Sequence, residues 1–173
     1  MKQSHEAQNQ SIGSVADSKV GTNAYLQSGS KGVYGCGTNK CNELVADSVQ
    51  ESGRPRPQVP KSGILGWLGF KRDPTANEWA NPNVNIPGWS KPGPVSGAAP
   101  NDVIAQQHGA WGHAGIVVRT MDGSLATVSV NSTTNPAGMV TRNDWGFRPT
   151  GGNGEGPHDP APVVRHYVGD LIP

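Results

Sequence analysis

One hairpin constrains the fold of this 173-residue chain more than any other feature. Residues 113–119 carry a β-branched apolar run, and residues 126–131 alternate regularly between apolar and polar side chains. The dipeptide Asp122-Gly123 lies between the two segments and favours the tight turn that joins antiparallel strands. Residues 103–105 and 163–168 predict two further strands. The carboxyl-terminal half of the chain therefore predicts a small antiparallel sheet.

Helical patterns precede these strands in the sequence. Apolar residues recur at helical spacing over residues 42–52, and Gly53 followed by Pro55 ends that pattern. Weaker patterns predict a short helix over residues 15–26 and a helical turn over residues 75–80. A helix followed by an antiparallel meander is typical of the α+β class.

The length of the chain predicts one domain with two irregular parts. Residues 1–16 are polar, which predicts a disordered amino terminus before a single domain over residues 17–173. The chain contains 24 glycines and 15 prolines, and many of them fall in a long loop region at about 54–100. Trp67 and Phe70 belong to an apolar island in that loop and are expected to anchor it.

The charge pattern excludes several classes of partner. The 13 acidic and 14 basic residues nearly cancel, so we expect neither nucleic-acid binding nor attraction of a broad basic face to a membrane. No apolar run is long enough to span a bilayer, so we expect no membrane insertion. The amino terminus lacks the apolar core of a Sec signal peptide, so export would need a dedicated apparatus.

Cys41 and His113 form the most informative pair of reactive side chains. Cys41 lies where the polar residues Asn39 and Lys40 give way to the predicted helix, and His113 opens the first strand of the hairpin. A helix amino terminus and a nearby imidazole both favour the thiolate, which predicts a lowered pKa for Cys41. A cysteine nucleophile with a histidine base needs no cofactor and no metal.

Other interpretations of these residues stay open. A zinc site could use Cys36, Cys41, His108 and His113, although neither pair has the spacing that zinc sites favour. Cys41 could also be a small buried residue, and His113 a structural one. A bond between the two cysteines would block the nucleophile, so a redox role for Cys36 remains open.

Four local motifs resemble the papain-like cysteine amidases and peptidases of the NlpC and CHAP groups. Tyr34 precedes Cys41 by seven residues, and residues 41–45 are similar to the nucleophile turn of these families. Residues 99–105 resemble the Pro-Gly-Asp-Val segment, with Asn101 in place of glycine, and Gly-His-Ala-Gly-Ile-Val at 112–117 is the best match. The resemblance covers about residues 30–135. It implies a papain-like fold in which the nucleophile helix packs on a small antiparallel sheet.

The resemblance also assigns catalytic roles. Cys41 would attack an amide carbonyl, and His113 would take the thiol proton and later protonate the leaving amine. The backbone N–H of Cys41 would stabilise the oxyanion, with help from the hydroxyl of Tyr34. A third residue would orient the imidazole from the neighbouring strand. Asn131 is the first choice for that role, Ser129 the second, and Asp144 a distant third.

The segment around Cys41 and the Ala-x-x-Trp-Ala-x-Pro motif of residues 76–82 are similar to interbacterial amidase effectors of type VI secretion. This resemblance implies cleavage of an amide in the peptidoglycan stem peptide. Trp111 lies two residues from His113, and we expect Trp111 and Asn42 to contact the substrate. The resemblance also implies a secretion apparatus, action in the periplasm or cell wall of a target bacterium, and a cognate immunity protein. The bond that is cut, and the choice between a secreted toxin and a phage lysin, stay open.

Two other classes of function compete with hydrolysis. The chain could be a catalytically inactive papain-like or zinc-stabilised binding module. It could also be a transglutaminase-like acyl-transfer enzyme that uses the same pair of residues.

Overall fold

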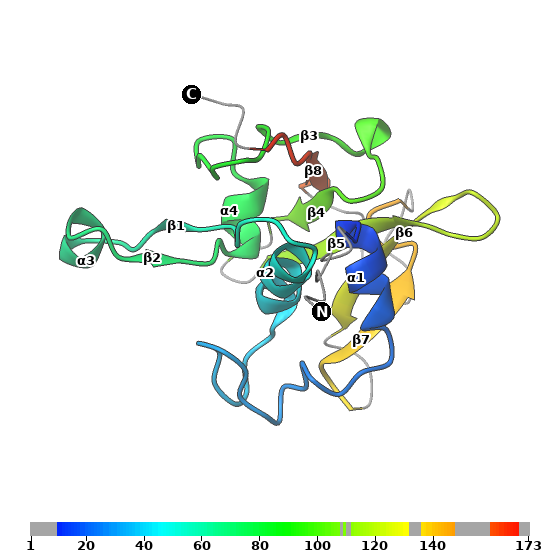
Figure 1. Ribbon diagram of the computed structural model, residues 1–173, viewed down its shortest axis with the longest axis horizontal. Helices are drawn as coiled ribbons and strands as arrows, with labels where there is room; N and C mark the ends of the chain where they lie inside the picture. Colours follow the sequence, from blue (N-terminus) through cyan, green and yellow to red (C-terminus); the bar gives the residue numbers. More distant parts are fainter. Residues whose placement is uncertain (1–9, 108, 110–111, 132–135, 148–159, 170–173) are drawn as a thin grey trace, which may run out of the picture.

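A computed structural model describes residues 10–107, 109, 112–131, 136–147 and 160–169 and has an α+β fold (Figure 1). The helices are α1 (Ile12–Ser18), α2 (Cys41–Glu51), α3 (Ile64–Trp67) and α4 (Ala76–Ala80), with a 3-10 turn, η1 (Val95–Gly97). The strands are β1 (Val59–Pro60), β2 (Lys71–Arg72), β3 (Gly93–Pro94), β4 (Val103–Gln106), β5 (His113–Arg119), β6 (Leu125–Asn131), β7 (Met139–Asn143) and β8 (Val163–Arg165).

The main sheet has six antiparallel strands in the order β3-β8-β4-β5-β6-β7. The predicted hairpin is confirmed as β5 and β6, in which Gly115 lies opposite Ser129. On the other side of β5, His113 lies opposite Gln106 of β4. The sequence did not predict β3 and β7, which form the two edges of the sheet.

The two faces of the sheet carry different packing. Helices α1, α2 and α4 supply Ile12, Leu44 and Trp79 to the larger core, which also holds the β5 side chains of Ala114 and Ile116. A smaller cluster contains Ile104, Val117, Trp145 and Val164. Its residues on β4 and β5 alternate along each strand with residues of the larger core. Because side chains alternate across a strand, the small cluster lies on the face opposite the helices.

The amino-terminal boundary differs from the prediction. The segment predicted to be disordered up to residue 16 contains most of α1, which begins at Ile12 rather than within residues 15–26. The Ser11 side chain caps this helix by accepting a hydrogen bond from the Ser14 N–H. Ile12 and Ala16 are fully buried and lie four residues apart, on one face of the helix. This helical spacing was not detected in the sequence, because most of the surrounding residues are polar. Residues 1–9 lie outside the described part of the chain.

The Pro/Gly-rich region at 54–100 contains short elements instead of one long loop. Strands β1 and β2 form a two-stranded ribbon that carries α3 at its end and projects from the body at the left of Figure 1. Trp67 and Phe70 are 84% and 53% exposed there, so the expectation that they anchor the loop is wrong. Across the described residues, helices long and apolar enough to cross a membrane are absent.

Asn101 ties the start of the sheet to α1. Its φ of 82° lies in the left-handed region that favours glycine, and the motif that it interrupts usually has glycine at this position. The Asn101 side chain accepts a hydrogen bond of 2.8 Å from the Gly13 N–H. Asparagine therefore adopts the turn that glycine would adopt and adds a contact to the helix.

Candidate active site

Cys41 is the first residue of α2 and lies between that helix and the sheet. Its side chain is 3% exposed and belongs to the larger core. Its backbone N–H donates a hydrogen bond of 2.9 Å to the side-chain oxygen of Asn39. Asn39 therefore satisfies one of the free N–H groups that every helix start leaves, and it fixes the turn that presents the cysteine.

Burial and the nearby backbone act in opposite directions on the pKa of the Cys41 thiol. Burial raises the pKa of the thiol to about 11, and hydrogen bonds from the backbone of Ala114, Asn42 and Cys41 itself oppose that rise. Because Ala114 is the second residue of β5, the sulfur lies against the start of the strand that His113 opens. The sequence predicted a lowered thiol pKa. That prediction is wrong, because the polar neighbours of Cys41 in the sequence do not expose its side chain.

His113 lies next to this position but points toward a different neighbour. Its ring centroid is 4.6 Å from that of Trp145, and the two rings are nearly perpendicular. Burial lowers the pKa of His113 to about 4, so the imidazole is neutral at neutral pH. Ala114 faces the helices and Val117 the small cluster, so alternation also places His113 on the face of Trp145.

The structure therefore brings Cys41 and His113 to the same end of β5 without joining their side chains. Within the described residues, no hydrogen bond links the thiol to the imidazole. Both groups are neutral at rest, because burial disfavours both the thiolate and the imidazolium. A neutral imidazole is the form that can accept a proton from the thiol once the two groups meet.

The contact with Trp145 predicts a change in the titration of His113. We expect Trp145→Ala to admit water and to raise the His113 pKa from about 4 toward the ordinary value of about 6.5. An NMR titration of the imidazole carbons measures this shift. Phe147→Ala is the control, because Phe147 packs against the same cluster. An equal rise in both variants would show that general loosening of the cluster, and not the ring contact, sets the pKa.

The three candidates for the orienting residue occupy different settings. Ser129 is buried on β6 and lies opposite Gly115 of β5. The same antiparallel register places Asn131, two residues further along β6, level with His113. Residues level with one another on neighbouring strands share a face, so Asn131 remains the first choice. Asp144 precedes Trp145 and is exposed.

Tyr34 and Asn42 lie close to the thiol. Burial raises the pKa of Tyr34 above its ordinary value, and the charges of Asp73, Glu43 and Cys41 add to that rise. The phenol is therefore protonated and can donate a hydrogen bond near the sulfur. The Asn42 side-chain oxygen is 3.8 Å from the Cys41 sulfur. Trp111 lies outside the described residues.

A cluster of charges beside Tyr34 was not predicted. Arg56 binds both oxygens of Asp73 at 2.9 and 2.7 Å, one oxygen of Asp47 at 2.8 Å and one of Glu43 at 3.1 Å. These carboxylates come from α2 and from the segment after β2, so Arg56 joins α2 to the base of the ribbon of β1 and β2. Glu43 and Asp47 are four residues apart on α2, a spacing that could have suggested a shared cation.

The two acidic residues of α2 have opposite pKa shifts. Burial raises the pKa of Glu43, and the charge of Arg56 opposes that rise only in part. Burial also acts on Asp47, but hydrogen bonds from Arg56 and Tyr25 and the charge of Lys31 outweigh it and lower the pKa. Ionisation of Glu43 thus costs folding free energy above its folded pKa. Ionisation of Asp47 adds stability that is lost as the pH falls through its folded pKa.

We therefore expect Glu43→Gln and Asp47→Asn to change stability in opposite ways with pH. Between acidic and neutral buffer, the stability of Glu43→Gln relative to the parent protein should rise. That of Asp47→Asn should fall, because it loses a favourable carboxylate at neutral pH. Urea unfolding at both pH values measures the two differences, and changes of the same sign in both variants would contradict the assigned shifts.

The zinc alternative finds no support in the described residues. Cys36 is exposed and its thiol lies 3.2 Å from the Ser28 carbonyl, whereas Cys41 is buried. In the described part of the chain, no three histidine, cysteine, aspartate or glutamate side chains are grouped to hold a metal ion. His108 lies outside that part.

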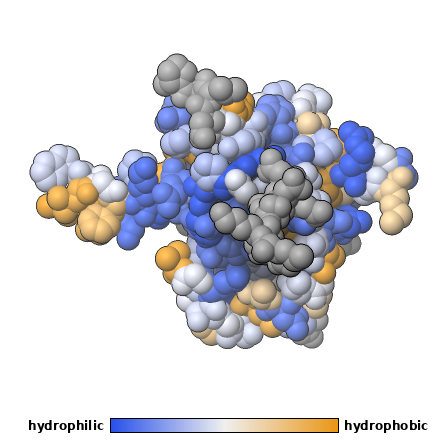
Figure 2. Space-filling view, in the orientation of Figure 1, coloured by the Kyte–Doolittle hydropathy of each residue, from blue (hydrophilic) through white to orange (hydrophobic). Residues whose placement is uncertain are grey.

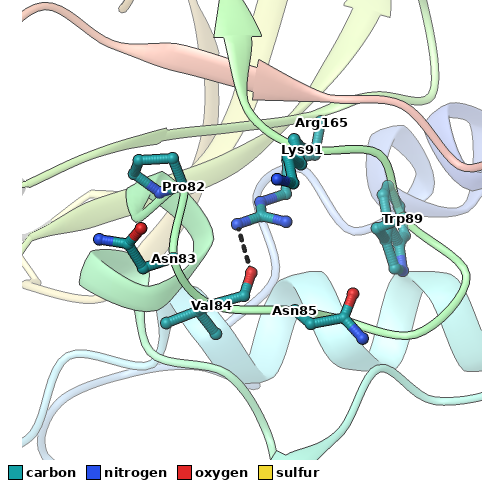
Figure 3. Close-up of a pocket in the computed structure, with 7 residues that line it drawn as sticks. All are labelled: Pro82, Asn83, Val84, Asn85, Trp89, Lys91 and Arg165. Carbon is teal, nitrogen blue, oxygen red and sulfur yellow. Dashed lines mark hydrogen bonds between the residues drawn. The ribbon is translucent and has the colours of Figure 1, made fainter.

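A separate cavity of about 360 Å³ lies under the loop after α4 (Figure 3). Arg165 forms part of its wall and is 1% exposed. The guanidinium donates hydrogen bonds of 2.7 to 2.9 Å to backbone carbonyls of this segment, namely those of Trp79, Asn81, Val84 and Ser90. These contacts explain the buried cation as a clamp on the loop. The described lining includes none of the residues near Cys41.

No family model, curated protein or solved structure gives a significant match to this chain.

Proposed function

We propose that this protein is a cysteine amidase of papain-like architecture, in which Cys41 is the nucleophile and His113 is the base. One observation carries the proposal: Cys41 is the first residue of α2, a helix that packs on β5, and β5 begins at His113. A nucleophile fixed beside backbone donors suits acyl transfer, in which a thioester forms and water then cleaves it.

The proton path follows from the neutral resting forms. The imidazole lies on the Trp145 face of the sheet and the thiol on the helix face, so the imidazole must first reach the sulfur through a rearrangement at the start of β5. It then accepts the thiol proton as the thiolate attacks the amide carbon. The same proton passes to the departing amine, and His113 finally activates the water that hydrolyses the thioester. Tyr34 is protonated, and we propose that it donates to the oxyanion and that Asn131, level with His113 on the neighbouring strand, orients the ring.

The substrate class rests on the sequence resemblance. We propose that the amide belongs to the peptide stem of bacterial peptidoglycan. We also propose that the protein acts as a secreted antibacterial effector and is restrained in the producer by an immunity protein. Digestion of purified sacculi, followed by mass spectrometry of the released fragments, tests this proposal and identifies the bond that is cut.

A second candidate is a papain-like binding module without activity. It is favoured by the raised thiol pKa and by the contact of His113 with Trp145 in place of Cys41. Sacculi that bind the protein but release no new fragments would favour this candidate. A transglutaminase-like enzyme would instead join an added primary amine to the peptide, which the same mass spectra detect as a mass increase.

A further inference from the structure

The end of the projecting arm carries five large apolar side chains in solvent. Ile64, Leu65, Trp67, Leu68 and Phe70 are 72%, 45%, 84%, 56% and 53% exposed, and we call them the apolar tip. In Figure 2, orange and pale side chains lie together at the far end of the arm, away from the body. The other exposed large apolar residues of the described chain, Val20, Val33 and Met121, lie apart from the tip in the sequence.

The fold does not account for the apolar tip. None of its members belongs to either core cluster, and α3 is joined to the body through the short ribbon of β1 and β2. A contiguous exposed apolar group of this kind marks a surface that another molecule covers. Exposed single residues such as Met121 need no such explanation.

Two lysines lie directly behind the apolar tip. Lys71 is opposite Pro60 in the ribbon, and the Lys61 N–H donates a hydrogen bond of 2.9 Å to the Phe70 carbonyl. Both lysines are exposed, and we call them the lysine collar. The sequence from residue 54 to 72 contains five basic residues and no acidic one. The molecule that covers the tip should therefore be apolar at its interior and negatively charged at its surface.

We propose that the apolar tip inserts into the interface of an anionic phospholipid membrane while the lysine collar contacts the headgroups. Tryptophan, leucine and phenylalanine beside lysine form the composition that prefers this interface. The narrow end of a projecting ribbon also fits a soft surface better than the flat, broad area of a standard protein interface. The sequence excluded a membrane partner from overall charge and spanning length, and neither criterion detects a short wedge. The proposal does not depend on amidase activity.

Sedimentation with vesicles tests the proposal. The parent protein should bind vesicles of phosphatidylcholine mixed with phosphatidylglycerol, and bind vesicles of phosphatidylcholine alone more weakly. Trp67→Ser and Leu68→Ser should each lower the partition coefficient on the mixed vesicles by about tenfold, since each removes a large inserted side chain. Lys61→Gln and Lys71→Gln should each lower it by about fivefold, and only on the charged vesicles.

Matched variants separate the tip from general surface effects. Met121→Ser removes an exposed apolar side chain elsewhere, and Lys91→Gln an exposed charge elsewhere, so both should bind like the parent. In a Trp111→Phe background, Trp67→Leu should keep binding but lose most of the fluorescence quenching by brominated lipid, because the remaining tryptophans, Trp79, Trp89 and Trp145, are buried. Absence of binding to either vesicle would overturn the proposal. So would equal binding by Trp67→Ser, or association of the protein through the tip without vesicle binding.

Discussion

Replacement of Cys41 by alanine is expected to lower the rate of sacculus cleavage by about 10⁴-fold or more, to the background of the assay. The thioester cannot form without the sulfur, and in the proposed mechanism no other side chain takes its place. Alanine fits the space of the buried thiol, so the helix start and its contact with β5 should persist. Quantitative mass spectrometry of fragments from purified sacculi measures the rate, and circular dichroism checks the fold.

Cys36→Ala is the matched control for this prediction. Cys36 is the second thiol of the chain and is exposed, so its loss should leave cleavage unchanged. His113→Ala should lose about as much activity as Cys41→Ala, and the double variant little more, because the two groups act in one step. Fragment release by Cys41→Ala at the parent rate would refute the assignment of the nucleophile.

Arg165→Met is expected to destabilise the protein by about 3–5 kcal/mol, which corresponds to a fall in Tm of roughly 10 °C. The guanidinium is 1% exposed and donates to carbonyls of four residues in the segment after Glu78. Methionine fills similar volume but donates nothing, so those buried carbonyls would lose their partner. Thermal unfolding monitored by circular dichroism measures the change.

Arg119→Met provides the comparison for Arg165→Met. Arg119 ends β5, is exposed and donates to the Gly123 carbonyl at 2.8 Å. Its replacement should change the stability by less than about 1 kcal/mol, as is usual for surface positions. Similar losses in the two variants would mean that the loop after α4 does not depend on the buried guanidinium.

Local patterns predicted much of the sheet and of helix α2. The alternation of residues 126–131 and the turn at Asp122-Gly123 determined β5 and β6, because register and turn chemistry agree. Strand β7 was missed because the five residues Met-Val-Thr-Arg-Asn show little alternation between apolar and polar side chains. The pairing of β8 with β4 joins segments about sixty residues apart, and no local rule predicts such a contact.

The orientation of the candidate site was less predictable than its location. Both faces of β5 are apolar, so alternation alone did not show whether His113 would face the helices or Trp145. The pKa of Cys41 depends on burial, and polar neighbours in the sequence suggested an exposed thiol that the fold does not have. The two prolines that flank Arg56 predicted only the end of a helix. The ion pairs of Arg56 could not be predicted, because its carboxylate partners come from two separate segments.

The hydrogen bond from the Cys41 N–H to Asn39 has a consequence for which state of the substrate this amide would favour. In the resting protein this amide already has a neutral acceptor, the Asn39 side-chain oxygen at 2.9 Å. A substrate carbonyl is also a neutral acceptor. If it displaced the Asn39 oxygen from the Cys41 N–H, one neutral hydrogen bond would be exchanged for another. The tetrahedral intermediate carries a negative oxygen, and a charged acceptor forms the stronger bond. The hydrogen bond from the Cys41 N–H would therefore stabilise the bound substrate very little and the transition state more. Stabilisation of the transition state beyond that of the bound substrate is what increases kcat.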